Sequence, residues 1–295
     1  MSRIQANLLL LLAGAMWGMG FVAQSTAMEA IGPFLFIGLR FAIAFITMLP
    51  FALWESRGAA PLSPRDNRNF MAIGLLLFAG MAAQQIGLLT TTVTNSGFLT
   101  GLYVVMVPFL SVLLFRKWPH RVVWPGALSA LAGIWLLSGA GSVSFRPGDW
   151  LTILCALFWA LQVIMIARSA AHTGRPVTLA VTQFGVTAAI ALAIAFLSEP
   201  VDIPAIRLAL PEILYAGIFS GGIAFTLQVI GQRYTTAPQA AIFLSTEAVF
   251  AALFGAIFLG ERLPPTGLAG CVLIFAAILL VELVPAMRPR QSATS

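Results

Sequence analysis

Ten long apolar runs, separated by short polar stretches, dominate the pattern of this sequence. Each run has about 20 residues, which is the length a helix needs to cross the hydrocarbon core of a bilayer. The runs are continuous, whereas the strands of a membrane barrel alternate in polarity, so helices are favoured. The pattern predicts an all-α integral membrane protein with ten transmembrane helices, at about residues 5–25, 33–53, 69–90, 95–115, 121–140, 149–168, 176–197, 211–232, 238–259 and 265–284.

Two stretches half a chain apart resemble each other. Residues 84–109 read QQIGLLTTTVTNSGFLTGLYVVMVPF, and residues 228–251 read QVIGQRYTTAPQAAIFLSTEAVFA. Gln85 matches Gln228, and the later residues follow in the same register. A repeat that spans half the chain fixes the architecture, so we expect two related five-helix halves.

The composition agrees with a membrane protein. Hydrophobic residues make up 60% of the chain and charged residues 9%, whereas a soluble domain carries about 25% charged residues. The net charge of +6 does not indicate nucleic acid, because the basic residues lie in short loops between apolar runs. Cys155 and Cys271 lie inside apolar runs, which predicts buried thiols and no disulfide framework.

The positions of Lys and Arg predict the orientation. With a cytoplasmic N-terminus, twelve of these residues fall in inside segments and three, Arg146, Arg207 and Arg262, in outside loops. Both termini are then cytoplasmic. Because each half has five helices, the second half enters the membrane the other way up, and such inverted repeats support alternating access. The expected division is residues 1–143, residues 144–287 and a cytoplasmic tail, 288–295.

Several motifs resemble one family. AMWGMGFVAQSTAME near the start, the pair Arg40–Phe41, NSGFLTGLYVVMVPF and STEAVFAALFGAIFLGERL are similar to the drug/metabolite transporter superfamily, and within it to the ten-helix EamA-type exporters. The nearest resemblance is to YddG-like amino acid and metabolite exporters. It implies that helices one, three, four, six, eight and nine line the cavity. The family often has Glu-Pro where this chain has Glu247–Ala248, so the kink of the ninth helix is expected to be absent or displaced.

Polar residues inside the runs are the candidate site residues. Ser96, Thr100 and Tyr103 share one face of the fourth predicted helix. Ser and Thr there also commonly bond to carbonyls of their own helix, but a tyrosine needs a partner, which favours a cavity. The repeat-related face of the ninth helix carries Gln239, Phe243 and Thr246.

Two charged residues lie within spans. Glu247 is the only acid near the middle of a span, and an unpaired carboxylate there is costly, so it is neutral, paired or facing water. It is a candidate proton or substrate-amine site, or a hydrogen-bond partner of a neighbouring helix end. Arg40 is the only base within a span. Three roles are open for it: it binds a substrate carboxylate, it ties helices together, or its side chain reaches to the membrane interface.

Aromatic rings beside amides mark the start of each half. Trp17 in the first helix and Trp159 in the sixth stand at matching places. Such rings can bind a substrate that has an apolar part and a polar group, or they can serve in ordinary packing. The further cavity candidates near them are Phe21, Gln24, Gln162, Gln84, Gln85 and Gln228.

The sequence therefore predicts a secondary transporter in the bacterial inner membrane that exports neutral or aromatic amino acids. The alternatives are an organophosphate or nucleotide-sugar exchanger, an intramembrane enzyme and a channel. We expect no catalytic residues, no metal and no cofactor, because no paired in-span acids or zinc-binding helix is present. The expected partners are a small-molecule substrate and the lipid bilayer, without nucleic acid; a homodimer is left open.

Overall fold

The computed structural model describes residues 1–91, 93–116, 118–137, 146–258 and 265–287, without the side chains of residues 21, 25, 93–95 and 285–287. Every regular element in these residues is helical. The elements are α1 (Arg3–Ala27), α2 (Pro33–Ser56), α3 (Pro64–Leu88), α4 (Val93–Gly101), α5 (Tyr103–Phe115), α6 (Val123–Leu137), α7 (Pro147–Thr173), α8 (Pro176–Ser198), α9 (Ile203–Leu208), α10 (Leu210–Tyr215), the π-helix η1 (Ala216–Ala224), α11 (Phe225–Gln232), α12 (Ala237–Leu244), α13 (Glu247–Phe258) and α14 (Pro265–Met287).

The predicted ten-helix architecture is confirmed. Nine spans in the described residues are long and apolar enough to cross a membrane, and the tenth, α6, is a shorter apolar helix. Prolines stand in the first turn of many helices, as Pro64 and Pro176 do, because that position needs no N–H donor. The helix α3 starts five residues before its apolar run because Ser63 caps a charged first turn that contains Asp66.

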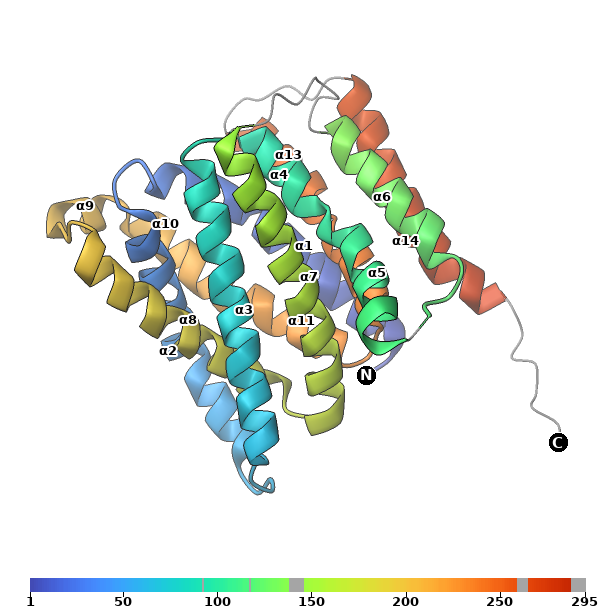
Figure 1. Ribbon diagram of the computed structural model, residues 1–295, viewed down its shortest axis with the longest axis horizontal. Coiled ribbons are helices and arrows are strands. Elements are labelled where there is room, and N and C mark those ends of the chain that lie inside the picture. The colour runs from blue at the N-terminus through green and yellow to red at the C-terminus, as the bar shows by residue number, and fades with distance from the viewer. Residues whose placement is uncertain (92, 117, 138–145, 259–264, 288–295) are drawn as a thin grey trace.

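The helices pair in a pattern that reflects two inverted halves. The helix α2 packs along α8, and α6 packs along α14, so equivalent helices of the two halves meet each other (Figure 1). The helix α3 packs against α7, and the same relation recurs between α1 and the span formed by η1 and α11. The arrangement is that of two inverted five-helix repeats.

The pair of α6 and α14 shows how closely equivalent helices approach. A Cβ atom on Gly133 would lie 2.6 Å from the carbonyl oxygen of Gly270, and one on Gly270 would lie 2.4 Å from that of Gly133. Only glycine permits this backbone contact. Both helices lie at one edge of the bundle, away from its centre (Figure 1).

A carboxylate links the ends of α8 and α2. Glu199, which follows the last residue of α8, accepts hydrogen bonds from the backbone N–H groups of Phe34 (2.9 Å) and Leu35 (2.7 Å). These N–H groups belong to the first turn of α2 and have no partner within their own helix. Glu199 therefore caps α2 from another helix, where an anion also interacts favourably with the helix dipole.

The opposite end of the same pair repeats this contact. Glu55, at the end of α2, accepts from the backbone N–H groups of Val177 (3.0 Å) and Thr178 (2.7 Å) in the first turn of α8. The Thr178 hydroxyl donates to the same carboxylate at 2.7 Å. The two helices thus cap each other, once at each end of the bundle, as an inverted repeat requires.

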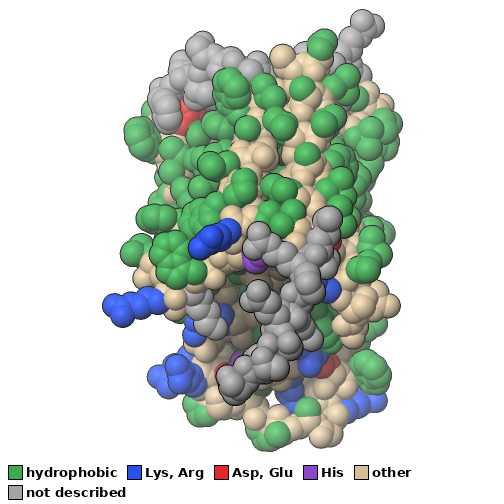
Figure 2. Space-filling view, turned by 90° about the vertical axis from the view of Figure 1, so that its right-hand side faces the viewer, with side chains coloured by type: hydrophobic (Ala, Val, Ile, Leu, Met, Phe, Trp, Pro, Cys, Tyr) green, Lys and Arg blue, Asp and Glu red, His purple; other side chains and the backbone are tan. Residues whose placement is uncertain are grey.

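Basic side chains gather at one end of the face that Figure 2 shows. Figure 2 shows a face that is mostly hydrophobic above, with most of its Lys and Arg side chains in the lower part, which is the end where Figure 1 marks the N-terminus. Apolar side chains such as Leu197, which is 89% exposed, point outward along the spans. A hydrophobic belt above a basic end is typical of a multi-pass membrane protein.

Candidate functional site

A cavity lies between the helices in the middle of the bundle. Its volume is about 60 Å³, which holds a few water molecules and is well below the roughly 300–1,000 Å³ of common ligand pockets. A larger ligand therefore requires the helices to move apart. The residues that line it are Trp17, Gly20, Gln24, Arg40, Met81, Gln84, Thr100, Tyr103, Trp159, Val163, Ser220, Phe225, Gln228, Leu244 and Glu247.

Three aromatic rings form one wall of the cavity. Phe225 stacks on Trp159, with ring centroids 5.7 Å apart and planes at 19°, and packs against Trp17 at 4.6 Å. The indole N–H of Trp17 donates to the backbone oxygen of Ser220 at 3.0 Å, which fixes the ring. The indole N–H of Trp159 is buried and has no hydrogen-bond partner that meets the usual geometry among the described residues.

Arg40 brings a positive charge to the cavity. It is 4% exposed, and its guanidinium donates to the Ser220 hydroxyl at 3.1 Å and, at a longer 3.4 Å, to the side-chain oxygen of Gln24. The rings of Phe36 and Phe41 lie 5.6 and 5.2 Å from it. Its Nε atom has no partner in the described residues.

Glu247 brings the negative charge, at a local change of helix geometry. Thr246 N–H bonds to the oxygen of Phe243, and Ala248 N–H to that of Ser245, which are tight contacts three residues apart between α12 and α13. The ninth span is therefore irregular just before Glu247, although no proline follows that residue. The carboxylate forms no hydrogen bond or ion pair with any described residue.

The same irregularity occurs in the fourth span. Leu102 N–H bonds to the oxygen of Leu99, three residues before it, at the junction of α4 and α5. Leu102 and Ser245 are separated by the spacing that separates Gln85 from Gln228. Both halves therefore bring a distorted helix turn to the cavity, as many secondary transporters do at their binding sites.

Hydroxyl and amide groups complete the lining on the first half. Gln84 donates from its side-chain nitrogen to the Thr100 hydroxyl at 3.2 Å. The Tyr103 hydroxyl is buried and has no partner in the described residues. Unpartnered buried polar atoms are rare in native proteins, and here several of them belong to residues that line one cavity.

A chain of glutamines lies behind the cavity in the second half. Gln228 donates to Gln162 at 3.5 Å, and Gln162 donates to Gln183 at 3.1 Å. One helical turn further along, Gln232 donates to the backbone oxygen of Val163 at 3.1 Å. These bonds tie α7, α8 and α11 together.

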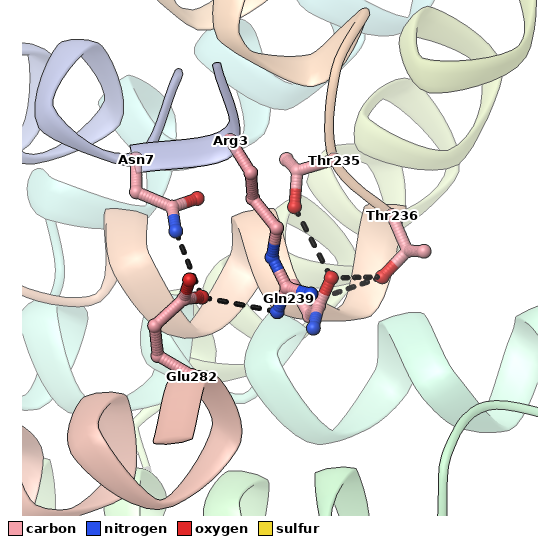
Figure 3. A network of polar contacts seen from close by, with 6 residues as sticks. All are labelled: Arg3, Asn7, Thr235, Thr236, Gln239 and Glu282. Atoms are coloured by element: carbon pink, nitrogen blue, oxygen red, sulfur yellow. Dashed lines mark hydrogen bonds and ion pairs between the residues drawn. The ribbon is translucent and has the colours of Figure 1, made fainter. Parts of the chain in front are cut away.

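Polar contacts link helices at the end of the bundle near the N-terminus. Arg3 forms an ion pair with Glu282 at 3.0 Å, and Asn7 donates to the same carboxylate oxygen at 2.8 Å (Figure 3). Beside them, Thr235 and Thr236 donate to the side-chain oxygen of Gln239. The helix α1 is therefore tied to α14 at this end.

A second contact at the same end joins α7 to α5. The guanidinium of Arg168, near the end of α7, lies 4.0 Å from the ring centroid of Phe115 at the end of α5. Gln24 and Gln84, by contrast, line the cavity from the opposite ends of α1 and α3. The cavity is thus nearer to the end of the bundle opposite the N-terminus.

The structure brings nine of the sixteen candidate residues to the cavity. The candidates that line it are Trp17, Gln24, Arg40, Gln84, Thr100, Tyr103, Trp159, Gln228 and Glu247. The side chain of Phe21 lies outside the described residues. The six candidates with described side chains that do not line it are Gln85, Ser96, Gln162, Gln239, Phe243 and Thr246.

The residues away from the cavity have other contacts. Gln85 donates to the Met28 sulfur at 3.1 Å, and Thr246 bonds back to the oxygen of Phe243 at 2.7 Å. Gln239 belongs to the group near the N-terminal end (Figure 3). Sharing a helical face with a lining residue did not bring them to the cavity, because a span crosses a small cavity only over a turn or two.

Sequence reasoning missed two prominent lining residues, Ser220 and Phe225. Ser220 lies in the π-helix η1 and contacts both Arg40 and Trp17. Nothing in the apolar run around it predicts the π-helix. The matching span of the first half, α3, is a continuous α-helix, so the repeat gives no signal either.

No group of three or more His, Cys, Asp or Glu side chains that could hold a metal ion comes together in the described part of the chain.

Comparison with known proteins gives a consistent picture. The model of the EamA-like transporter family matches this chain twice, over residues 4–139 and 146–283. An uncharacterized transporter of Archaeoglobus fulgidus is 33% identical over 290 residues, covering 95% of this chain and 87% of that protein. The uncharacterized inner membrane transporter YedA of Escherichia coli strain K12 is 27% identical, covering 90% and 86%.

A solved crystal structure shares the fold. It superposes with a TM-score of 0.82 at 21% identity and covers 96% of this chain and 98% of the other. Two family matches that together span nearly the whole chain, a relative above 30% identity and the ten-helix fold agree. This chain is a multi-pass membrane transporter that belongs to the EamA-like transporter family, within the drug/metabolite transporter superfamily.

Proposed function

We propose that this protein exports neutral amino acids with large apolar side chains from the cytoplasm, across the bacterial inner membrane, by alternating access. One observation carries the proposal: a central cavity combines a wall of three aromatic rings with one cation and one carboxylate, neither of which is paired with an opposite charge among the described residues. A large neutral amino acid has an apolar side chain that matches the aromatic wall and two charged groups that match the charges of the cavity. Its side chain suits the rings, and its ammonium and carboxylate suit the two charged groups.

The small volume of the cavity supports a carrier over a channel. A channel needs a continuous pore through the bundle, whereas the cavity between these helices has a volume of about 60 Å³. The contacts of Arg3 and Asn7 with Glu282 tie α1 to α14 at the end near the N-terminus, and we take them as part of the closure of that end. With cytoplasmic termini, as the basic residues indicate, this is the closed inner side of an alternating-access cycle.

Flux into and out of reconstituted proteoliposomes tests the proposal. The substrates are phenylalanine, tyrosine, tryptophan, methionine and leucine, with glutamate, a nucleoside and a sugar phosphate for comparison, each with and without a pH gradient. We expect saturable flux of the large neutral amino acids and mutual competition between them. Trans-stimulation by unlabelled substrate identifies a carrier, because a channel does not exchange one molecule for another.

An organophosphate or nucleotide-sugar exchanger is the second candidate. A phosphate dianion needs several donors and cations, and Arg40 is the one cation among the described lining residues. Phosphate-ester exchange without amino acid flux in the same vesicles would contradict the proposal and favour this candidate.

A further inference from the structure

The surroundings of Arg40 are unusual for a buried cation. The ion pairs formed within the described residues are Arg3–Glu282 and His172–Asp66, and neither involves Arg40. Among the described residues, its guanidinium donates to two neutral oxygens, those of Ser220 and Gln24, and Nε has no partner. Because a buried charge without a counter-ion is costly, the site is poised for an anion.

The geometry around Arg40 favours a small, flat anion. A guanidinium presents five N–H donors in a rigid fork that matches the two oxygens of a carboxylate. The two protein contacts use one N–H on each terminal nitrogen, and the bond to Gln24, at 3.4 Å, is long. The aromatic rings of Phe36 and Phe41 hold the guanidinium in place without neutralising it.

The position of Ser220 depends on a glycine in α1. A Cβ atom on Gly20 would lie 2.7 Å from the Ser220 hydroxyl, so any larger residue there would displace that oxygen. Gly20 itself lines the cavity. The hydroxyl that orients Arg40 therefore stands at the cavity wall because α1 has no side chain at this point.

We propose that Arg40, oriented by Ser220, binds the carboxylate of the transported molecule, and that the opposite end of that molecule lies toward Glu247. This inference rests on the proposed function and deepens it, since it names the group that is recognised. Arg40 is a specificity-determining residue: it selects a free carboxylate over an ester or amide of the same shape. Ser220 is a positioning residue that acts through Arg40.

The test compares ligands that differ at the carboxylate or at the amine. Affinities of the purified full-length protein in detergent are measured by tryptophan fluorescence for L-phenylalanine, L-phenylalaninamide and 3-phenylpropionate. The last compound keeps the carboxylate and lacks the amine. The variants are Arg40→Gln and Ser220→Ala, with Arg207→Gln, an exposed arginine of α9, as the matched control. Gel filtration and far-ultraviolet circular dichroism check that each variant is folded.

We expect wild type to bind phenylalanine at least about tenfold more tightly than its amide. Arg40→Gln should weaken the binding of phenylalanine by about 30-fold or more, while the amide changes by less than about threefold. Ser220→Ala should reduce the discrimination by several-fold and Arg207→Gln should not change it. If Arg40→Gln does not fold, the comparison of the acid with the amide in wild type and in Ser220→Ala decides the question.

The outcomes separate this inference from the proposed function. Equal binding of phenylalanine and its amide by wild type, together with amino acid flux in vesicles, would overturn the role of Arg40 and leave the transport proposal intact. An equal loss of both ligands in a folded Arg40→Gln variant would also overturn it, because a structural role affects both alike. Binding of 3-phenylpropionate that needs Arg40, without amino acid binding, would support the carboxylate site and reject the amino acid assignment.

Discussion

The reciprocal caps of α2 and α8 give a quantitative prediction for stability. Glu199→Gln keeps the volume of the side chain but leaves a single acceptor oxygen where the carboxylate accepts from Phe34 and Leu35. A hydrogen bond to a charged group contributes about 1.5–3 kcal/mol, and the half-buried position of Glu199 reduces this through solvent screening. We therefore expect the free energy of unfolding to fall by about 1–2 kcal/mol.

Glu55→Gln should have an effect of at least this size, since its carboxylate also accepts from the Thr178 hydroxyl. Glu199 caps the start of α2, whereas Glu55, near the end of α2, caps the start of α8. The 24 residues of α2 span about 36 Å, so the two caps lie far apart and their effects should add. The double variant should lose about 2–4 kcal/mol. Unfolding in mixed micelles, followed by far-ultraviolet circular dichroism as the fraction of denaturing detergent rises, measures this quantity.

The control is Glu29→Gln, which changes an exposed glutamate and should move the free energy of unfolding by less than about 0.5 kcal/mol. A double variant that is as stable as this control would refute the reasoning. So would a loss in the double variant that equals the loss in either single variant, because it would mean that the caps are not independent.

The remaining predictions concern transport and topology. Glu247→Gln should weaken transport without preventing membrane insertion, because the carboxylate lines the cavity; transport equal to wild type across a range of pH would exclude it as the coupling group. Replacing Trp17 or Tyr103 by Ala should reduce flux of aromatic amino acids more than flux of leucine, and an equal reduction would indicate a loss of structure. Glu282→Gln should release α1 from α14, so a cysteine at Gln239 should react about threefold to tenfold faster with an impermeant maleimide; an unchanged rate would show that the ion pair does not close this end. Labelling of single cysteines should place both termini in the cytoplasm, and an external C-terminus would contradict the ten-span topology.

Much of the fold follows from the sequence because the bilayer imposes a simple rule. A backbone in hydrocarbon has to satisfy its own hydrogen bonds, so each long apolar run becomes a helix. The predicted helix ends are less accurate where a helix continues beyond the apolar run into water. The helix α7 extends to Thr173, beyond the expected end near residue 168, and the positive φ of Gly174 then ends it.

The cavity was harder to predict because it depends on local departures from regular helices. Apolar periodicity does not indicate the π-helix that contains Ser220, since the helical pattern continues through Ser220 and the two glycines that follow it. Arg40 was recognised as a charge within a span, but its neutral partners come from helices far apart in the sequence. Proline accounts for neither irregular turn: Pro108 lies six residues beyond Leu102, and no proline marks the equivalent turn before Glu247.

The two charges of the cavity have no duplicates, although the chain is built from two copies of one plan. At the repeat-related position of Arg40 stands Gln183, which is bonded to Gln162, and at that of Glu247 stands Val104. Two equal sets of charges, related by an inverting axis, would accept a dipolar molecule in either of two opposed directions. With one cation from the first half and one anion from the second, the cavity is itself a dipole. It can align a dipolar molecule in one direction only. That direction is the same whether the cavity opens toward one face of the membrane or toward the other.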